Sequence, residues 1–233
     1  MAAVEYNVGG EIFSVLAAHS KPPCLLNAAT LFRAHCEGIK LLGVDINDFQ
    51  SFEEELTTLP GKYCPARKGG LWVMYKANST SAVACVALRC HEWPAAAEIK
   101  RLYVCPSGRQ QGLGRILSLH AMQHAVEIGY NSILLDSLER QAPAVRLYES
   151  LGFQRVPQYI ANPEPDAVFM GFSCTPRGKA SITQQLSAFK CDVSVWGPRL
   201  RMVTATAAAL LLGVAVVCGV GSARHTQSKA VAA

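Results

Sequence analysis

The sequence predicts an α/β fold, in which a β-sheet is flanked by helices and followed by a separate apolar C-terminal segment. Two observations support this prediction. From residue 71 to residue 173, β-like runs first follow one another and then alternate with helical patterns in the order strand, helix, strand, helix, strand, which is typical of α/β domains. Beyond residue 201 the chain changes to an uncharged run of 22 residues. A chain of 233 residues accommodates one ordinary domain plus such an extension.

The first half of the predicted domain contains two helices and three strands. Apolar positions at helical spacing predict a helix over 25–42, and a second, short helix that carries Phe52 and Leu56 and ends at Leu59-Pro60-Gly61. Two runs rich in Val, Ala and Leu, 71–76 and 81–89, are joined by 77–80 and predict a hairpin. A third strand is expected over 97–104.

The second half alternates helix and strand. Leu113, Ile116, Leu117 and Ala121 follow helical spacing within a predicted helix over 111–128. A buried strand over 131–137, a helix over 141–151 and a last strand over 167–172 complete the predicted domain.

Composition excludes several classes of function. The formal net charge is +5, but the basic residues are scattered, so nucleic-acid binding has little support and a basic cleft for an anionic cofactor explains the balance. Nine cysteines contain no C-x-x-C pair, which favours reduced thiols in a cytosolic protein over a zinc site. His120 and His124 have the i, i+4 spacing of metal ligands, but no third ligand is apparent in the sequence. We therefore expect no metal.

The apolar run 202–223 is long enough to span a membrane. As a helix, 22 residues extend about 33 Å, against a hydrocarbon core of roughly 30 Å. Trp196, Arg201 and Arg224 flank it, as interface anchors do. The run predicts a transmembrane tail anchor with the domain in the cytosol. A buried helix, or an Ala- and Gly-rich tail of a soluble cytoplasmic protein, are the alternatives.

The segment Arg109-Gln110-Gln111-Gly112-Leu113-Gly114 stands at the start of the 111–128 helix. Glycines allow close approach of a ligand to the backbone, and a helix N-terminus attracts phosphate. By itself the segment is also compatible with a helix start that binds nothing. A dinucleotide-binding fingerprint would need a third glycine at position 117, which is Leu.

Two motifs together resemble the GNAT N-acetyltransferase superfamily. The pattern R/Q-x-x-G-x-G/A is matched by Arg109, Gly112 and Gly114, and A-x-x-L-Y-x-x-x-G-F is matched from Ala144 to Phe153. The resemblance extends over residues 27–173 and is closest to a subgroup of small members. The remaining segments would be an N-terminal extension or first strand (1–26), a linker (174–201), the apolar helix (202–223) and a short tail (224–233).

The resemblance implies a mixed, splayed sheet with acetyl-CoA in the split between the strands 97–104 and 131–137. The backbone of Leu102, Tyr103 and Val104 would hold the pantetheine arm and polarise the thioester carbonyl. The pyrophosphate would bind the loop residues with Arg115; the implied set is Arg109, Gln110, Gln111, Gly112, Leu113, Gly114 and Arg115. The family often has Asn where this chain has Gln141, whose longer side chain would shift a pantetheine contact.

The implied reaction is acetyl transfer from a thioester to an amine, by direct attack in a ternary complex. Such a reaction needs a proton acceptor for the amine and a proton donor for the leaving thiolate. Glu98 corresponds in position to the glutamate base of some GNAT members; its alternative is a strand carboxylate paired with Lys100. Tyr148 corresponds to the general acid; its alternative is an aromatic residue of the core.

The acceptor is expected to be a small-molecule or peptide amine, with Tyr63, Arg67, Tyr159 and Asn162 as candidates to line its pocket. Two other functions stay open at this point. One is a membrane-tethered acyl-CoA-binding or sensing module without catalysis. The other is a membrane interaction protein that uses the fold as a scaffold.

Overall fold

A computed structural model describes residues 3–46, 50–91 and 95–190. The described strands form one eight-stranded sheet in the order β1-β2-β3-β4-β5-β6-β8-β7. Every neighbouring pair is antiparallel except β5 and β6, which are parallel. The mixed α/β sheet that the sequence predicts is therefore present, and its one parallel junction lies between the two halves of the sheet.

The N-terminus adds a hairpin that sequence reasoning assigned only as an extension or first strand. Strands β1 (Val4–Val8) and β2 (Glu11–Ala17) are joined by Gly9 and Gly10, which have φ of 60° and 89°. Two consecutive positive φ angles are what a tight two-residue hairpin turn requires, and glycine adopts them without strain. Tyr6 and Phe13 are buried, so the hairpin belongs to the core.

The centre of the sheet is a meander followed by a crossover. Strands β3 (Gly70–Lys76), β4 (Ala82–Cys90) and β5 (Ala96–Val104) follow one another, and α4 (Leu113–Glu127) then leads to β6 (Ser132–Leu138). Helix α5 (Ala142–Ser150) precedes β7 (Gln154–Arg155) and β8 (Ala167–Ser173). These elements match the predicted ranges within two residues, apart from the short β7, which the sequence did not indicate.

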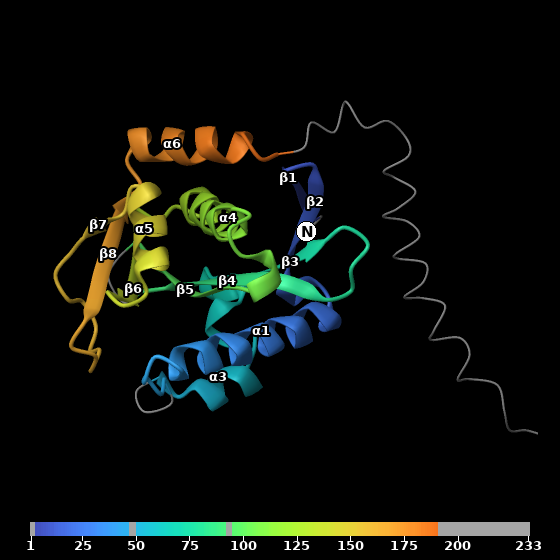
Figure 1. Cartoon of the computed structure of the whole chain (residues 1–233). Helices are drawn as coiled ribbons and strands as arrows, with labels where there is room; N and C mark the ends of the chain where they lie inside the picture. Colours follow the sequence, from blue (N-terminus) through green and yellow to red (C-terminus); the bar gives the residue numbers. More distant parts are fainter. Residues whose placement is uncertain (1–2, 47–49, 92–94, 191–233) are drawn as a thin grey trace, which may run out of the picture. The chain divides into compact units, whose positions relative to one another are not determined.

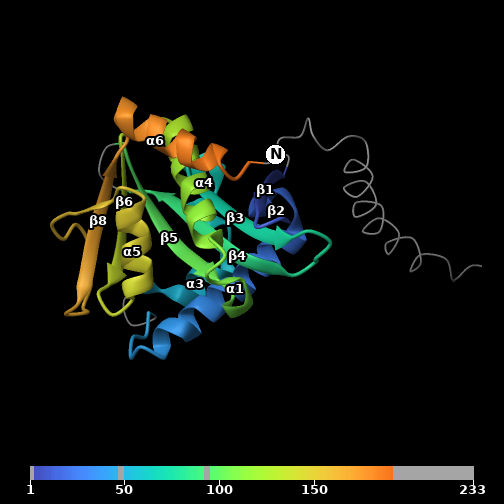
Figure 2. The same cartoon turned by 45° about the horizontal axis from the view of Figure 1, so that its top comes forward.

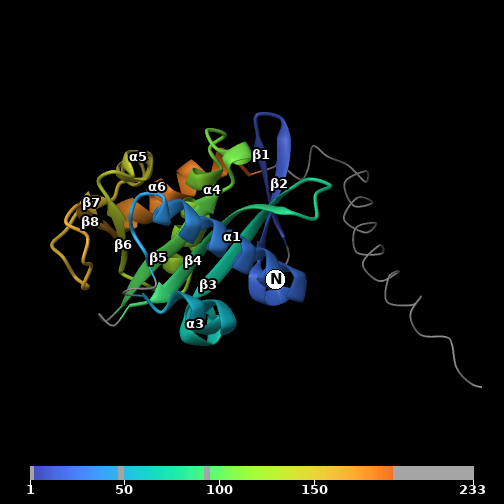
Figure 3. The same ribbon diagram turned by 60° about the horizontal axis from the view of Figure 1, so that its bottom comes forward.

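Helices cover both faces of the sheet. Helices α1 (Pro22–Lys40) and α3 (Phe52–Thr57) lie below the sheet, and α4, α5 and α6 (Pro176–Ser187) lie above it (Figure 1). Figure 3 shows α1 and α3 from their own side. Each face has its own apolar core, one with Ile116 and Leu117 of α4 and the other with Leu31 and Phe32 of α1. The short 3-10 helices are Ala18–Ser20, Gly61–Tyr63, Pro65–Arg67 and Pro106–Gly108.

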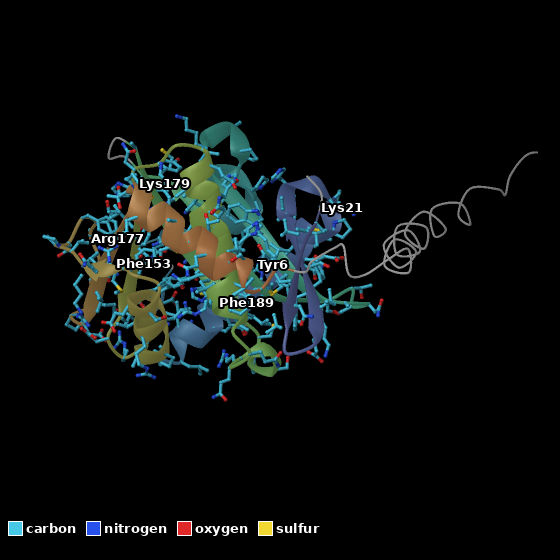
Figure 4. The ribbon with its side chains drawn as sticks, turned by 90° about the horizontal axis from the view of Figure 1, so that it is seen from above. Tyr6, Lys21, Phe153, Arg177, Lys179 and Phe189 are labelled. Carbon is cyan, nitrogen blue, oxygen red and sulfur yellow. The ribbon has the colours of Figure 1, made fainter. Side chains whose placement is uncertain are left out.

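Part of the range 174–201, which the sequence predicts to be a linker, is helical in the structure. Residues Pro176–Ser187 form α6, which starts at Thr175, whose side chain accepts a hydrogen bond from the backbone N–H of Gly178. Ile182 and Leu186 of α6 are buried in the core that α4 also fills. In Figure 4, α6 crosses over α4, from the end marked by Arg177 and Lys179 towards Phe189 near Tyr6. An amphipathic helix buries its apolar stripe, so α6 is part of the domain.

The predicted apolar helix 202–223 and the tail 224–233 lie outside the described residues. Within the described part of the chain, no helix is both long enough and apolar enough to cross a membrane.

Candidate active site

Strands β5 and β6 pair over three residues and then separate. Ala96–Glu98 lie opposite Ser132–Leu134 in parallel. Beyond that point β5 continues beside β4, and β6 continues beside β8. Figure 2 shows α4 and α5 over the same face of the sheet, next to β5 and β6. The facing edges of β5 and β6 past the split carry peptide groups that no ladder uses, and unpaired peptide groups bind a ligand or water.

A bulge in β5 lies beside the split. Ala87 pairs with Lys100 and Cys85 with Tyr103, so β5 has one more residue than β4 over this stretch. Arg101 has φ of 57°, a left-handed conformation that costs a non-glycine residue about 1–2 kcal/mol. Bulges redirect side chains and interrupt regular pairing, so this bulge breaks the regular hydrogen-bond pattern at the end of β5.

The side chain of Arg101 fastens the bulge to α3. Its guanidinium donates to both carboxylate oxygens of Glu55, at 2.8 and 3.0 Å. Lys62 lies 2.5 Å from the same carboxylate, and the Tyr63 hydroxyl donates to it at 2.9 Å. Burial disfavours the charged form of Glu55, but the hydrogen bonds and charges of Arg101 and Lys62 outweigh burial and lower the pKa of Glu55 to about 2. Glu55 is therefore ionised at neutral pH.

The start of α4 has free backbone donors. Gly112 precedes the helix with φ of 81°, and no side chain caps this end. The first helical hydrogen bond is donated by Ile116 to the carbonyl of Gly112, so the N–H groups of Leu113, Gly114 and Arg115 have no acceptor within the helix. A Cβ at Gly112 would meet nothing within 4 Å, which leaves room beside the backbone. These features fit a phosphate group.

Arg109 lies between this helix start and the split. Its Nε donates to the carbonyl of Val104 at 3.1 Å, and its guanidinium carbon lies 6.0 Å from the centre of the Tyr103 ring. The Gln111 side chain donates to the carbonyl of Ser107 at 3.0 Å and so braces the loop. Gln110 is exposed and has φ of 62°. The loop thus joins the end of β5 to the helix start.

Arg115 has a different environment. Its two terminal nitrogens donate to Gln185 of α6 at 2.6 Å and to Ser150 of α5 at 2.8 Å. The guanidinium therefore ties α4 to α5 and α6. The backbone N–H of Arg115 remains one of the free donors at the helix start.

A cavity of about 110 Å³ lies where the split meets the α1 side of the sheet. The bulge and the end of β6 form part of its wall, and Gln141 and Tyr148 of the α5 region form another part. The other lining residues come from α1, from the chain that follows α1, and from the segment before β8: His35, Ile39, Val44, Ile46, Gln50, Asn162 and Glu164.

The comparisons with known proteins agree with this geometry. The sequence profile described as "Acetyltransferase (GNAT) family" matches residues 43–153. An uncharacterised N-acetyltransferase of Schizosaccharomyces pombe is 37% identical over 134 residues, which is 58% of this chain and 80% of the relative. The chain belongs to the GNAT acetyltransferase family.

Solved GNAT-like structures share the fold. An acetyltransferase from Streptococcus agalactiae aligns with a TM-score of 0.57 and 21% identity, over 69% of this chain and 98% of that one. A Salmonella typhimurium protein solved with its cofactor acetyl-CoA aligns with a TM-score of 0.54 and 17% identity, over 70% of this chain and 95% of that one. The GNAT prediction is confirmed, the splayed sheet is that of the family, and the protein is an acyltransferase.

In this GNAT chain Tyr148 reaches the cavity from α5. Its side chain is 7% exposed and contacts the ring of Phe153 edge-on, with ring centres 5.8 Å apart. Burial and then the charge of Asp136 raise the pKa of Tyr148, so its hydroxyl is protonated at neutral pH. Tyr148 is thus both a core residue and a wall of the cavity. Gln141 is the N-cap of α5 and accepts a hydrogen bond from Ser137 at 3.3 Å.

Glu98 lies within an ion-pair network and does not line the cavity. Its side chain is 0% exposed. One carboxylate oxygen lies 2.5 Å from the guanidinium of Arg89, and the other accepts from the Tyr159 hydroxyl at 3.1 Å. Lys100 is 3.6 Å from that second oxygen. The predicted pairing of Glu98 with Lys100 is present, and an amine would reach Glu98 only by displacing one of these partners.

The polar cavity residues that sequence reasoning missed include His35, Lys100 as a lining group, and Asp136. Lys100 donates to Asp136 at 2.8 Å, and Asn162 donates to the other oxygen of Asp136 at 3.0 Å. Asp136 interrupts the apolar run of the strand 131–137, which was the available signal. His35 falls within a helical pattern and offered no signal.

The four candidates for the acceptor pocket separate in the structure. Asn162 lines the cavity, and Tyr159 contacts Glu98 behind it. Tyr63 and Arg67 instead line a different hollow, beside α3. His120 and His124 both pack edge-on against Trp72, and His120 accepts or donates a hydrogen bond with Tyr6 at 2.8 Å. Within the described ranges, no three potential metal ligands come together.

Proposed function

We propose that this GNAT protein is an acetyl-CoA-dependent N-acetyltransferase that transfers the acetyl group directly to an amine in a ternary complex. The observation that carries the proposal is the position of the uncapped start of α4 beside a split sheet that opens into a polar cavity. The helix start would bind the pyrophosphate, with the loop 109–114 around it. The peptide groups of 102–104 would hold the pantetheine arm and align the thioester with the cavity.

The proposed chemistry uses the wall of the cavity. Attack of the amine on the carbonyl carbon forms a C–N bond, and loss of the thiolate breaks the C–S bond. A backbone N–H near Val104 would stabilise the negative charge that develops on the carbonyl oxygen. Tyr148 would donate a hydrogen bond to the departing sulfur. Because burial keeps the Tyr148 hydroxyl protonated, it is available as a donor before the reaction begins.

Glu98 stays a prediction for the proton acceptor. Its oxygens are bound by Arg89 and Tyr159, so a direct role requires that Tyr159 move. Replacement of Glu98 by Gln removes the basic carboxylate and keeps its shape. A loss of kcat with an unchanged dissociation constant for acetyl-CoA is the result expected from a catalytic role.

The decisive experiment is a turnover assay with the full chain. Release of free CoA thiol from acetyl-CoA is followed with hydroxylamine, small primary amines and peptides with free N-termini as acceptors. Acceptor-dependent thiol release, together with detection of the acetylated product, is the expected result. A folded protein that acetylates none of these amines contradicts the proposal.

A second function, an acyl-CoA-binding module without catalysis, is favoured by one observation. Gln141 stands where the family often has Asn, and its carbonyl oxygen already accepts a hydrogen bond from Ser137. Calorimetry distinguishes the two functions, because the second one gives acetyl-CoA binding without turnover.

In either case we propose that residues 202–223 tether the protein to a membrane, on the basis of their length and lack of charge.

A further inference from the structure

Three groups that line the cavity are able to accept a proton: Asp136, Glu164 and His35. Asp136 is bound by Lys100 and Asn162. Burial disfavours its charged form, but the charge and hydrogen bond of Lys100 outweigh burial and lower the pKa of Asp136. Glu164 is paired with Arg140. Both carboxylates are therefore engaged in ion pairs.

His35 differs from the two carboxylates. It projects from α1 into the cavity wall that also contains Arg101, Leu102 and Tyr148. Its ring meets the ring of Tyr103 edge-on, with centres 6.1 Å apart and planes at 70°. In the part of the chain that the structure describes, His35 forms no ion pair and no hydrogen bond. The imidazole therefore stands next to the end of β5 with its nitrogens available.

Burial and the positive charges around His35 keep its imidazole neutral. Burial, and then the positive charges of Arg101 and Lys100, lower the pKa of His35 to about 3, against the opposing charge of Glu55. Asp136 and Glu164 are the other charged groups that line the cavity, and they are paired with Lys100 and Arg140. A neutral imidazole has a lone pair on one nitrogen, so His35 is ready to accept a hydrogen bond from an incoming amine at neutral pH.

We propose that His35 directly accepts the proton of the acceptor nitrogen during acetyl transfer. The inference rests on the proposed function. As the nitrogen bonds to the carbonyl carbon it becomes positively charged, and its proton passes to the ring nitrogen of His35. The C–S bond then breaks and its electron pair stays on the sulfur. The positive charges of Arg101 and Lys100 disfavour the imidazolium, so it passes the proton on to the thiolate and becomes neutral again.

This arrangement separates the roles of His35 and Glu98. His35 lines the cavity and contacts substrate, whereas Glu98 is buried behind it and holds Arg89, Lys100 and Tyr159. Glu98 would then act as a positioning residue, which keeps Lys100 and Tyr159 in place. Loss of either residue lowers activity, but only the loss of His35 leaves a gap that a free base is able to fill.

Chemical rescue tests the proposal with hydroxylamine as the acceptor. Hydroxylamine is small and is largely unprotonated at neutral pH, and its product, acetohydroxamate, is measured directly. In the full chain, His35→Ala is expected to lower kcat by about 100-fold or more, the effect typical of a lost general base. The dissociation constant for acetyl-CoA should change by less than about threefold. Added imidazole should restore at least a tenth of the wild-type kcat in His35→Ala, and it should not rescue Glu98→Gln.

Three results would overturn the proposal. A His35→Ala protein with wild-type kcat overturns the proposal. Loss of activity that imidazole does not restore, in a protein that still binds acetyl-CoA, also overturns it. If His35→Ala does not fold, His35→Gln keeps the side-chain volume, and wild-type kcat in that variant overturns the proposal as well. A wild-type protein that makes no acetohydroxamate and acetylates no other amine contradicts the proposed function itself, which is a distinguishable failure.

Discussion

The contribution of the buried ion pair between Glu55 and Arg101 to the stability of the fold can be measured directly. Glu55→Gln leaves the Arg101 guanidinium buried without its carboxylate, and Lys62 loses the same partner. Breaking one side of a buried ion pair costs about 3–5 kcal/mol. The pKa of Glu55 in the folded chain, about 2 against its usual 4.5, corresponds to roughly 3 kcal/mol at about 1.36 kcal/mol per pKa unit. The free energy from the pKa of Glu55 thus agrees with the cost expected for breaking a buried ion pair.

Urea unfolding of Glu55→Gln, with Glu54→Gln as a matched control, measures this cost. Glu54 is on the same helix and is exposed, so the control makes the same charge change without burial. We expect Glu55→Gln to lose about 3–5 kcal/mol, or roughly 6–20 °C in Tm, and Glu54→Gln to lose less than about 0.5 kcal/mol. A difference below about 1 kcal/mol between the two variants would mean that the Glu55 carboxylate does not stabilise the fold through Arg101 and Lys62.

The same pair gives a pH dependence whose sign is defined. The folded pKa of Glu55 lies below its unfolded value, so its contribution is complete above the unfolded pKa and is lost as the pH falls through the folded pKa. The stability gap between wild type and Glu55→Gln should therefore narrow between about pH 4.5 and pH 2. If the difference in the free energy of unfolding stays constant over this pH range, Glu55 is not held in its ionised form by Arg101 and Lys62.

Three further predictions follow from the site and the C-terminus. Tyr148→Phe should lower kcat by about 100-fold with little change in acetyl-CoA binding, as measured by calorimetry; equal activity removes Tyr148 from the mechanism. Gly112→Ala and Gly129→Ala both place alanine at a positive φ, 81° and 93°, with open space around the new Cβ, so both should cost about 1–2 kcal/mol of stability. Only Gly112→Ala should weaken acetyl-CoA binding. Equal dissociation constants for acetyl-CoA in the two variants would show that the loop at Gly112 does not bind the donor. The full chain should stay with membranes in alkaline carbonate, and its release would exclude an anchor at 202–223.

The central elements were predictable because their signals are local. The helix from Leu113 to Glu127 and the strand from Ser132 to Leu138 show the hydrophobic periodicity of one element each, and glycine follows the helix. The N-terminal hairpin had a usable signal as well, since Gly9-Gly10 separates two alternating runs. Helix α6 was missed because its apolar stripe is narrow and only its packing against α4 completes it.

The helix start that we propose as the donor site was predictable to a larger extent than the cavity that we propose for the acceptor. The free N–H groups at Leu113 and Gly114 follow from their place in a glycine-containing helix start. By contrast, the left-handed bulge at Arg101 depends on Glu55, 46 residues away in the sequence. The isolation of Glu98 from the cavity likewise depends on Arg89 and Tyr159, from another strand and a distant loop. Long-range ion pairs of this kind carry no signature in a single sequence.

An experimental structure of the full chain with acetyl-CoA would test the proposed donor site and the position of the thioester. We expect pyrophosphate oxygens within hydrogen-bond distance of the backbone N–H groups of Leu113, Gly114 and Arg115. The thioester should lie in the split between β5 and β6, with its acetyl group facing His35 and Tyr148. Acetyl-CoA bound at another surface, with the start of α4 unoccupied, would contradict the proposed donor site.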